Sequence, residues 1–427
     1  MFSYLTRGSS AAVFACVLSC SMASVAADFT EPHGELTLSA AITAALQRNP
    51  LLQTADFEIR VADAKIVQAA LHPNPELEAT LENFGGSGSM HGTASLESTL
   101  ALSQVIELGG KRSRRIDVAH FGRDSANIER DTAQLDVLAD VTRCYIEIAE
   151  QQELLSLTRR ATSLAQNTHD TISARVDTGR SPLVEKSRAA IALGRSQLDQ
   201  QQAERALLAA HHRLAALWGS TEPRFDSVKT DLFDLPPVAS FDTLMSRLQE
   251  SPEFLHYVNE SRLREAEWQL AKAEATSDVK IGGGLRHAED TGDNGIVLNF
   301  SMPLPFSNRN QGAIREASLH REQVEVEQQA ALINAQTNLF GLYQQLQSAR
   351  AEVVELRSHL LPQAEASLAQ TRDAYDKGRI SYLELVDAQR ELLELQRASI
   401  ASAAMYHRIV VEIERLTDQA LTANEIK

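Results

Sequence analysis

Apolar residues recur at every second position in four short stretches of the chain. Leu77 and Leu81 alternate with polar neighbours in the first stretch, and Ile296 and Leu298 do so in the last. A period of two is typical of a β-strand with one apolar and one polar face. The pattern predicts strands at about residues 75–84, 94–108, 278–287 and 295–306. Because the glycine-rich stretches ENFGGSGSMHG and RHAEDTGDNG separate the members of each pair, two hairpins are expected.

Helical periodicity governs most of the remaining chain. Stretches of about 35 residues at 38–71 and 241–275 precede the hairpins, and much longer stretches at 111–176 and 312–375 follow them. Apolar residues are spaced alternately by three and four between Leu332 and Leu360, which is a heptad pattern and predicts coiled-coil packing. Pro362 interrupts the second long stretch, so a kink is expected there. At about 1.5 Å per residue, two shorter helices stacked end to end match the length of one long helix.

The chain is internally duplicated. LQRNP at 46–50 returns as LQESP at 248–252, and DTGR at 177–180 returns as DKGR at 376–379, at a near-constant offset of about 200 residues. The sequence therefore predicts a first repeat at 38–219, a proline-containing connector at 220–241, a second repeat at 242–420, and a short tail at 421–427. Each repeat has the order helix, hairpin, long helix, turn and helix.

The first 27 residues are distinct from the rest. A single Arg7, an apolar stretch from Ala11 to Cys20 and small residues up to Ala27 predict a cleaved secretory signal peptide at 1–27. The alternative is that VLSC at 17–20 is a lipoprotein signal and that Cys20 becomes a lipidated N-terminus. After cleavage at Ala27 only Cys144 remains, so an internal disulfide is excluded for the exported chain.

Composition narrows the class further. The 427 residues carry a formal net charge of −16 and contain no Lys/Arg-rich run, which excludes the electrostatics of nucleic-acid binding. Beyond the leader no run of about 18 apolar residues exists, so entry into a membrane would require strands. Four strands cannot close a barrel, and lipid does not tolerate an open sheet edge. The chain is therefore expected to oligomerise, with 8, 12 or 16 strands in total.

The duplicated unit, the leader and the tip motif YDKGRISYLELVDAQ at 375–389 resemble the TolC-like outer-membrane efflux factors. LSQVIELGGKRSRR at 102–115 and SMPLPFSNRNQGAI at 301–314 resemble the heavy-metal branch of that family, the cobalt-zinc-cadmium and copper-silver exporters. The resemblance implies a mainly α fold with a small β part. It implies a homotrimer whose 12-stranded β-barrel in the outer membrane continues as a long α-helical coiled-coil barrel in the periplasm.

The resemblance also assigns candidate sites near the two helix tips. Glu384 and Asp387 lie one turn apart on one helix face and match the aperture acids of the family, so a trimer would gather six carboxylates that attract cations. Glu185 and Arg188 are their equivalents in the first repeat and would supply countercharges. The alternative is that this is an ordinary solvated helical face.

The tips themselves are Gly179 and Arg180 in the first repeat and Gly378 and Arg379 in the second. The resemblance implies that they contact a periplasmic adaptor, a membrane fusion protein. Helix termination alone explains the glycines as left-handed caps, but it does not explain why arginine follows in both repeats.

No residue pattern indicates catalysis, a cofactor or a metal site. His211 and His212 are adjacent, so on a helix they cannot face one ligand, and Met90 with His91 makes too small a coordination sphere. The leading hypothesis is a passive exit duct for heavy-metal cations, fed through the adaptor by an inner-membrane resistance-nodulation-division pump. One alternative is the same fold serving drug or protein export. Another is a periplasmic coiled-coil adaptor or scaffold, against which the four alternating strands argue.

Overall fold

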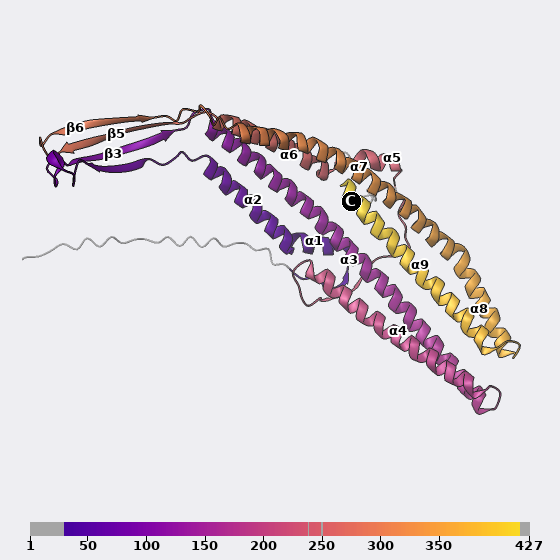
Figure 1. The fold of residues 1–427 in the computed structure, drawn as a ribbon. Coiled ribbons are helices and arrows are strands. Elements are labelled where there is room, and N and C mark those ends of the chain that lie inside the picture. The colour runs from indigo at the N-terminus through magenta and orange to yellow at the C-terminus, as the bar shows by residue number, and fades with distance from the viewer. Residues whose placement is uncertain (1–29, 238, 249–250, 419–427) are drawn as a thin grey trace, which may run out of the picture. The chain divides into compact units, whose positions relative to one another are not determined.

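The computed structural model describes residues 30–237, 239–248 and 251–418 (Figure 1). The predicted signal peptide with Cys20 and the tail at 421–427 lie outside the described residues. Residues from Pro32 onward form one compact unit, and the following description concerns that unit.

Helices make up most of this unit. They are α1 (Leu38–Arg48), α2 (Pro50–Ala69), α3 (Lys111–Asp177), α4 (Leu183–Ala216), α5 (Phe241–Leu248), α6 (Pro252–Glu274), α7 (Gln311–Glu355), α8 (Leu361–Asp376) and α9 (Tyr382–Thr417). The strands are β1 (Gly34–Leu36), β2 (Glu76–Glu82), β3 (Glu97–Ile106), β4 (Phe225–Val228), β5 (Val279–Ala288) and β6 (Asn294–Ser301). A hairpin followed by a long helix, a turn and a shorter helix occurs twice in this order.

The helix expected at 38–71 is interrupted, which corrects the sequence-based prediction. Asn49 ends α1 and begins α2, and its side chain accepts hydrogen bonds from the backbone N–H groups of Leu51 and Leu52. Pro50 takes the first helical position, where a missing N–H costs nothing. In the second repeat Ser251 and Pro252 occupy the same positions at the start of α6, but the Ser251 side chain makes no capping hydrogen bond. The repeated Asn-Pro and Ser-Pro pairs therefore mark helix starts.

The shorter helices stack beside the long ones, as their lengths predicted. Both α2 and α4 pack along α3, while α6 and α9 pack along α7, and α9 continues along α8 (Figure 1). The two repeats are joined because α3 also contacts α6 and α9. None of the helices in the described ranges is both long and apolar enough to cross a membrane.

The bend expected at Pro362 takes a specific form. A π-helical turn at Leu356–Leu360 separates α7 from α8, and Pro362 lies in the first turn of α8. A wider turn immediately before proline accommodates the ring and the lost hydrogen bond without ending the helical path. The chain thus keeps one nearly continuous helix while changing its direction.

The hairpins form one antiparallel sheet in the order β2-β3-β5-β6, so β2 and β6 are its edges. One face carries large apolar side chains that are exposed in the single chain, among them Leu77, Leu100, Leu285 and Leu298. The sheet is therefore apolar on a face that no other described residue covers. The last strand ends at Ser301 rather than near residue 306, because Pro303 and Pro305 offer no N–H to a ladder.

The opposite face of the sheet is crowded with small residues. Gly284 pairs with Ala101, and a Cβ built on Gly284 would lie 2.4 Å from the carbonyl oxygen of Leu100. Ala101 and Ser103 are buried there although they face no other layer. Only a hydrogen atom fits at Gly284, so the backbones of β3 and β5 approach closely there.

A second small sheet was not foreseen from the sequence. β1 pairs with β4 in parallel, which ties the segment before α1 to the connector. The Tyr145 hydroxyl bonds the carbonyl oxygens of Leu36 at 3.0 Å and Lys229 at 2.7 Å, and Gln152 pairs with the backbone of Val228. The connector is thus fixed against the middle of α3.

The main core of the second repeat lies where α7, α9 and α5 meet. Its members are almost fully buried: Leu244, Leu248, Leu339, Leu346, Tyr406, Ile409 and Ile413. Several of these belong to the heptad positions that the sequence predicted, and their burial confirms the coiled-coil interpretation for α7 and α9.

We predict that Gly284→Ala impairs folding of the sheet, whereas Gly283→Ala does not. The nearest atom to a Cβ at Gly283 is 3.7 Å away, an ordinary contact, whereas at Gly284 the backbone must move. Overpacking of this kind costs about 1–3 kcal/mol. Heat-modifiable migration of the purified protein on gels measures the folded fraction, and equal fractions for the two variants would contradict the prediction.

Candidate functional site

Both helix-turn tips use the same backbone geometry. Gly179 and Gly378 adopt positive φ angles of 71° and 69°, respectively, which few other residues tolerate. Arg180 N–H donates to the Arg175 carbonyl at 2.8 Å, and Arg379 N–H donates to the Ala374 carbonyl at 2.9 Å. These bonds close each long helix in a Schellman motif. Gly179, Arg180, Gly378 and Arg379 are all exposed at the two tips.

Glu384 is engaged at the start of α9. Its carboxylate accepts hydrogen bonds from the Ser381 backbone N–H at 2.7 Å and from the Ser381 hydroxyl at 3.0 Å. Ser381 Oγ in turn accepts the Glu384 N–H, so the pair forms a capping box. The bond from the Ser381 backbone, assisted by its hydroxyl, lowers the pKa of Glu384. Glu384 therefore points back toward the helix start.

Asp387 lies one turn further along α9 and is exposed. Arg390 pairs with Glu394 at 2.7 Å. That contact raises the pKa of Arg390, and the nearby Asp387 carboxylate adds to the effect. The two acids that the sequence placed on one helix face thus differ in role: Glu384 caps its helix, and Asp387 projects freely from it.

Glu185 and Arg188 lie beside an aromatic pair at the tip. Tyr375 and Tyr382 are buried with ring centroids 6.3 Å apart, and they pack with Ile172 and Leu385 in one cluster. Burial raises the pKa of both tyrosines, and the nearby Glu185 carboxylate adds to the effect. The structure therefore brings the start of α4 next to the start of α9.

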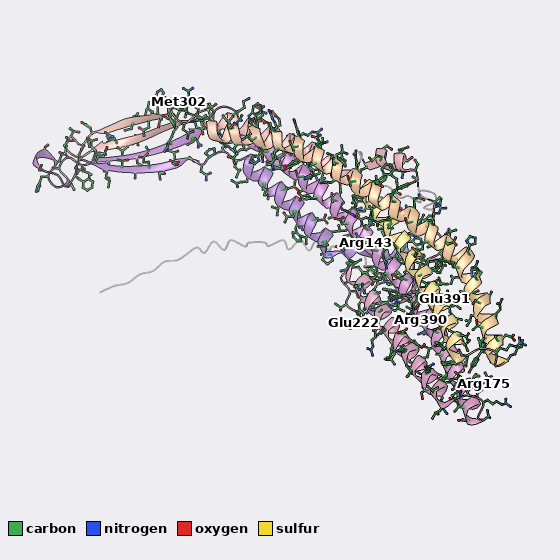
Figure 2. All side chains as sticks on the ribbon, turned by 45° about the vertical axis from the view of Figure 1, so that its right-hand side comes forward. Arg143, Arg175, Glu222, Met302, Arg390 and Glu391 are labelled. Atoms are coloured by element: carbon green, nitrogen blue, oxygen red, sulfur yellow. The ribbon has the colours of Figure 1, made fainter. Side chains whose placement is uncertain are left out.

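Arg175 connects the two repeats at the same end of the molecule (Figure 2). Its guanidinium carbon lies 4.7 Å from the centroid of the Tyr375 ring, and its Nη2 donates to the Asp376 carbonyl at 3.4 Å. The tip motif began at Tyr375, but sequence reasoning assigned that residue no role and did not single out Arg175 or Tyr382. The Ser-x-x-Glu spacing at 381–384 was, however, a readable signal for the capping box.

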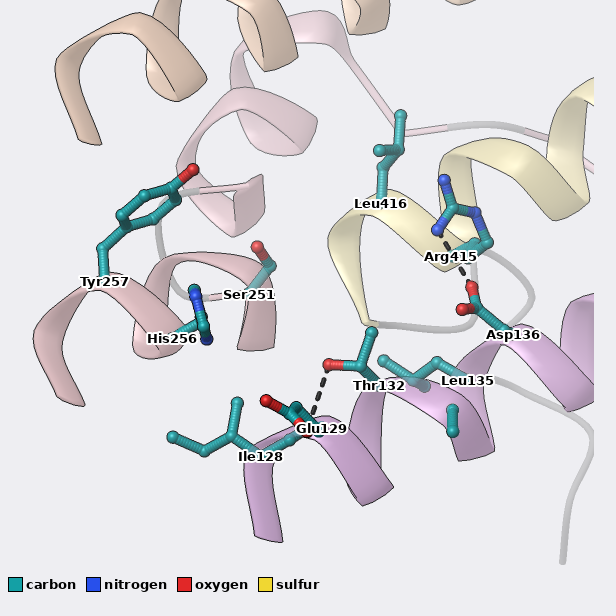
Figure 3. Close-up of a pocket in the computed structure, with 11 residues that line it drawn as sticks. Ile128, Glu129, Thr132, Leu135, Asp136, Ser251, His256, Tyr257, Arg415 and Leu416 are labelled. Carbon is teal, nitrogen blue, oxygen red and sulfur yellow. Dashed lines mark hydrogen bonds and ion pairs between the residues drawn. The ribbon is translucent and has the colours of Figure 1, made fainter. Parts of the chain in front are cut away.

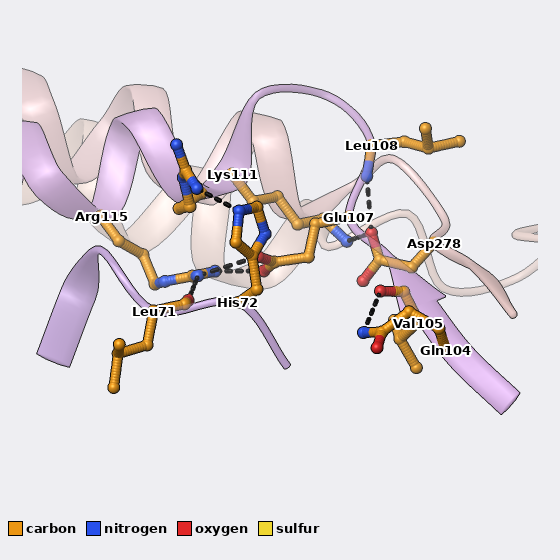
Figure 4. Close-up of polar contacts among 10 residues, drawn as sticks. Leu71, His72, Gln104, Val105, Glu107, Leu108, Lys111, Arg115 and Asp278 are labelled. Atoms are coloured by element: carbon orange, nitrogen blue, oxygen red, sulfur yellow. Dashed lines mark hydrogen bonds and ion pairs between the residues drawn. The ribbon is translucent and has the colours of Figure 1, made fainter. Parts of the chain in front are cut away.

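Polar contacts concentrate where the sheet meets the helices (Figure 4). Lys111 pairs with Asp278 at 2.8 Å, and Asp278 also accepts the Leu108 N–H at 3.0 Å. Arg115 donates to both carboxylate oxygens of Glu107, with Nη2–Oε2 at 3.0 Å. These bonds fix the start of α3 against the end of β3 and the start of β5.

The charges of this junction stabilise one another. The hydrogen bond from Arg115 lowers the pKa of Glu107. At Asp278 burial opposes ionisation, but the bonds from Lys111 and Leu108 outweigh it and the pKa is lowered. Folded-state pKa values below the ordinary carboxyl value mean stability that is present above about pH 4 and lost as pH falls. Glu107, Lys111 and Arg115 of the LSQVIELGGKRSRR segment therefore have a structural role at this junction.

The face of the sheet that carries Gly284, here called the polar face, has charged side chains at its hairpin end. Arg286 donates to Glu97 at 2.8 Å and to the Thr99 hydroxyl at 3.0 Å, and its other nitrogen lies 3.4 Å from Glu82. Nearer the junction, Lys280 pairs with Glu76 at 2.6 Å. Since Glu78 shares this face, acids outnumber cations on it.

The histidines and Cys144 have structural surroundings. His211 is buried against Phe225, with ring centroids 4.8 Å apart, and burial lowers its pKa, whereas His212 is exposed. Met90 and His91 lie exposed in the hairpin loop. Burial raises the pKa of the Cys144 thiol to about 11, so this cysteine is a poor nucleophile.

A cavity of about 500 Å³ lies between α3, α6 and the end of α9 (Figure 3). Its polar lining includes Tyr257, His256 and the ion pair of Arg415 with Asp136, whose atoms are 3.0 Å apart. Across the described ranges, no group of three or more His, Cys, Asp or Glu side chains is placed to hold a metal ion.

We predict that Ser381→Ala loosens the second tip, whereas Ser187→Ala does not. Losing the N-cap costs about 1 kcal/mol, while the Ser187 hydroxyl only bonds a carbonyl within its own helix. Hydrogen exchange of the first turns of α9 measures the effect. Because Glu384 has a lowered pKa, the parent should loosen there only as pH falls below the ordinary carboxyl value. Unchanged exchange in Ser381→Ala would contradict the capping role.

Known proteins share this architecture. Residues 41–220 match the family model described as "Outer membrane efflux protein". The cobalt-zinc-cadmium resistance protein CzcC of Cupriavidus metallidurans is 28% identical over 386 residues, covering 90% of this chain and 91% of that protein. The cation efflux system protein CusC of Escherichia coli K12 is 23% identical, covering 88% of this chain and 84% of that one.

Solved structures have the same fold. A CusC structure superposes with a TM-score of 0.74 at 16% identity, over 91% of this chain and 95% of that chain. The outer-membrane channel OprN gives a TM-score of 0.73 at 16% identity, over 90% of each chain. The duplicated unit and its two tips are thus similar in fold to these channels, and the chain is similar in sequence to the outer membrane efflux protein family over residues 41–220 and to a heavy-metal resistance protein over 90% of its length.

Proposed function

We propose that three copies of this chain form the outer-membrane exit duct of a tripartite efflux system that exports heavy-metal cations. The duct binds no cofactor and performs no chemistry. The observation that carries the proposal is the sheet: one face is apolar and exposed, the other is polar, and among the described residues nothing pairs with its two edges. Such a sheet fits lipid on one side and water on the other once further copies pair its edges.

The edges of the helical layer support the same assembly. On α7 the exposed apolar residues are seven positions apart: Leu319, Val326, Ile333 and Phe340. On α4 they have the same spacing: Val184, Ile191 and Leu198. A heptad stripe left exposed requires a partner helix. Since α4 and α7 lie at opposite margins of the layer, a neighbouring copy is the natural partner (Figure 1).

The proposed cargo rests on the relatives and on charge. CzcC is named for cobalt-zinc-cadmium resistance, and other relatives are named for nickel and cobalt resistance and for cation efflux. The excess of acids on the polar face of the sheet favours cations over anions. The rival reading, export of drugs or proteins by the same fold, lacks a comparable observation.

We assign the narrow periplasmic end to the helix tips. Asp387 contributes the charge at the aperture, with Glu384 holding the helix start in place. Glu185 and Arg188 line the neighbouring helix, and Arg188 supplies countercharge. The exposed Gly179–Arg180 and Gly378–Arg379 turns offer the adaptor two similar surfaces, which explains why arginine recurs after both glycines. An inner-membrane resistance-nodulation-division pump would deliver the ions to this end.

Deletion of the gene is expected to sensitise cells to divalent or soft metal ions more than to dyes or antibiotics. Growth of a strain without redundant exporters across a panel of metals and drugs measures this. The tip variant Gly378→Val, which cannot adopt the left-handed cap, should fail to restore growth, whereas the parent restores it. Unchanged metal tolerance with a drug phenotype would transfer the proposal to the drug branch.

Asp387→Asn is expected to reduce cation preference in planar bilayers more than Glu384→Gln does. A charge at contact distance in water is worth about 1 kcal/mol, or roughly fivefold in ion occupancy. Glutamine at 384 preserves the cap and removes a charge that points away from the open helix face. As a control, Glu82→Gln with Glu97→Gln at the hairpin end should leave the resting conductance unchanged. If Asp387→Asn matches the parent in selectivity, the helix face is merely solvated.

A further inference from the structure

The segment between β6 and α7 exposes large apolar residues although it is not part of the sheet. Met302, Leu304 and Phe306 are exposed in the described chain, and Phe306 is 79% accessible. Met302 lies at the helix-facing end of the sheet (Figure 2). Pro303 and Pro305 between them have no N–H, so a partner strand could not continue its ladder along this segment. Edge pairing between copies therefore does not account for these side chains.

These residues follow β6 with the same spacing in sequence, although the backbone leaves the strand after Ser301 and the Phe306 N–H donates to the Leu304 carbonyl at 2.9 Å. Ile296 and Leu298, which are 80% and 84% accessible, occupy the apolar face of the sheet. Met302, Leu304 and Phe306 keep the same every-second-residue spacing beyond Ser301. β6 alone has 8 residues, whereas a tilted strand needs about 9–11 to cross the hydrocarbon layer. The exposed apolar side chains beyond Ser301 extend the apolar surface at this end of the sheet.

Positive charge follows directly after the apolar run. The Arg309 Nε donates to the Pro305 carbonyl at 3.2 Å, and Arg315 is exposed one turn into α7. Within the described residues, neither arginine forms an ion pair with a carboxylate. Asn310 holds this point to the end of α6, because its side-chain amide donates to the Ala271 carbonyl at 2.8 Å. An apolar run that ends in unneutralised arginines matches acyl chains that end in phosphate headgroups.

We infer that the side chains of Met302, Leu304 and Phe306 lie against lipid at the helix-side boundary of the membrane, with their unpaired backbone in the hydrated headgroup layer, and that Arg309 and Arg315 bind the phosphate of anionic phospholipid headgroups. This inference rests on the proposed function and adds to it a lipid-contacting segment outside the strands. Phospholipid fits this segment because its acyl chains match the apolar side chains and its phosphate matches the two arginines.

Tryptophan substitutions in proteoliposomes containing brominated phosphatidylcholine test the inference. Leu304→Trp reports on the segment, Leu298→Trp on the sheet face, and Leu319→Trp on an exposed position of α7. The signal of the native Trp218 and Trp268 is subtracted using the parent protein. Should Leu304→Trp fail to assemble, the more conservative Phe306→Trp replaces it. We expect bromine to quench the added tryptophan equally at 298 and 304, and not at 319.

The outcomes separate the two proposals. Quenching at 298 without quenching at 304 and 306 overturns the inference, because water or another copy then covers the segment, while the membrane sheet stands. Absence of quenching at 298 overturns the proposed function, and this inference with it.

The headgroup contact has its own test. In mixed vesicles, the Leu304→Trp protein should be quenched more by brominated phosphatidylglycerol than by brominated phosphatidylcholine, by about fivefold for each arginine that binds phosphate. Arg309→Gln should remove much of this preference, whereas Arg379→Gln at the distant tip should retain it. Equal quenching by both lipids in the parent background overturns the assignment of the arginines.

Discussion

The backbone hydrogen-bonding groups at the outer edges of β2 and β6 set the constraint on which the rest of the molecule depends. Each unpaired N–H and C=O in an apolar environment costs several kcal/mol, so a four-stranded sheet with an exposed apolar face cannot stand alone in lipid. The close approach at Gly284 leaves no room for a larger side chain between β3 and β5. The exposed heptad stripes of α4 and α7 extend the same requirement along the helices.

Polar contacts at the junction hold the sheet in one orientation relative to the helices. The ion pairs of Lys111 with Asp278 and of Arg115 with Glu107 fix α3 to the strand ends, and Asn310 fixes α7 to α6. All of these contacts lie within about ten residues of a strand end. Sheet and helices therefore form one continuous wall whose direction is set at the junction.

At the other end, the four helices meet around Tyr375 and Tyr382, where packing rather than ion pairing dominates. Glu384 is used to start α9, which leaves Asp387 as the freely projecting acid. Two acids of similar type and adjacent position thus have different physical roles. The difference arises because Ser381 lies three residues before Glu384 and forms the capping box with it. At the equivalent point of the first repeat stands Pro182, which makes no side-chain cap.

Periodicity in the sequence determined the four hairpin strands, the long helices, the tip glycines and the duplication, because each of these depends on residues close together in the chain. It also indicated the family, through motifs that span the whole chain. Tertiary structure alone decided the β1–β4 pairing, the burial of the connector, and the ion pair between Lys111 and Asp278. These contacts join residues that are far apart in sequence, and no local pattern of polarity encodes which distant partner a side chain will meet.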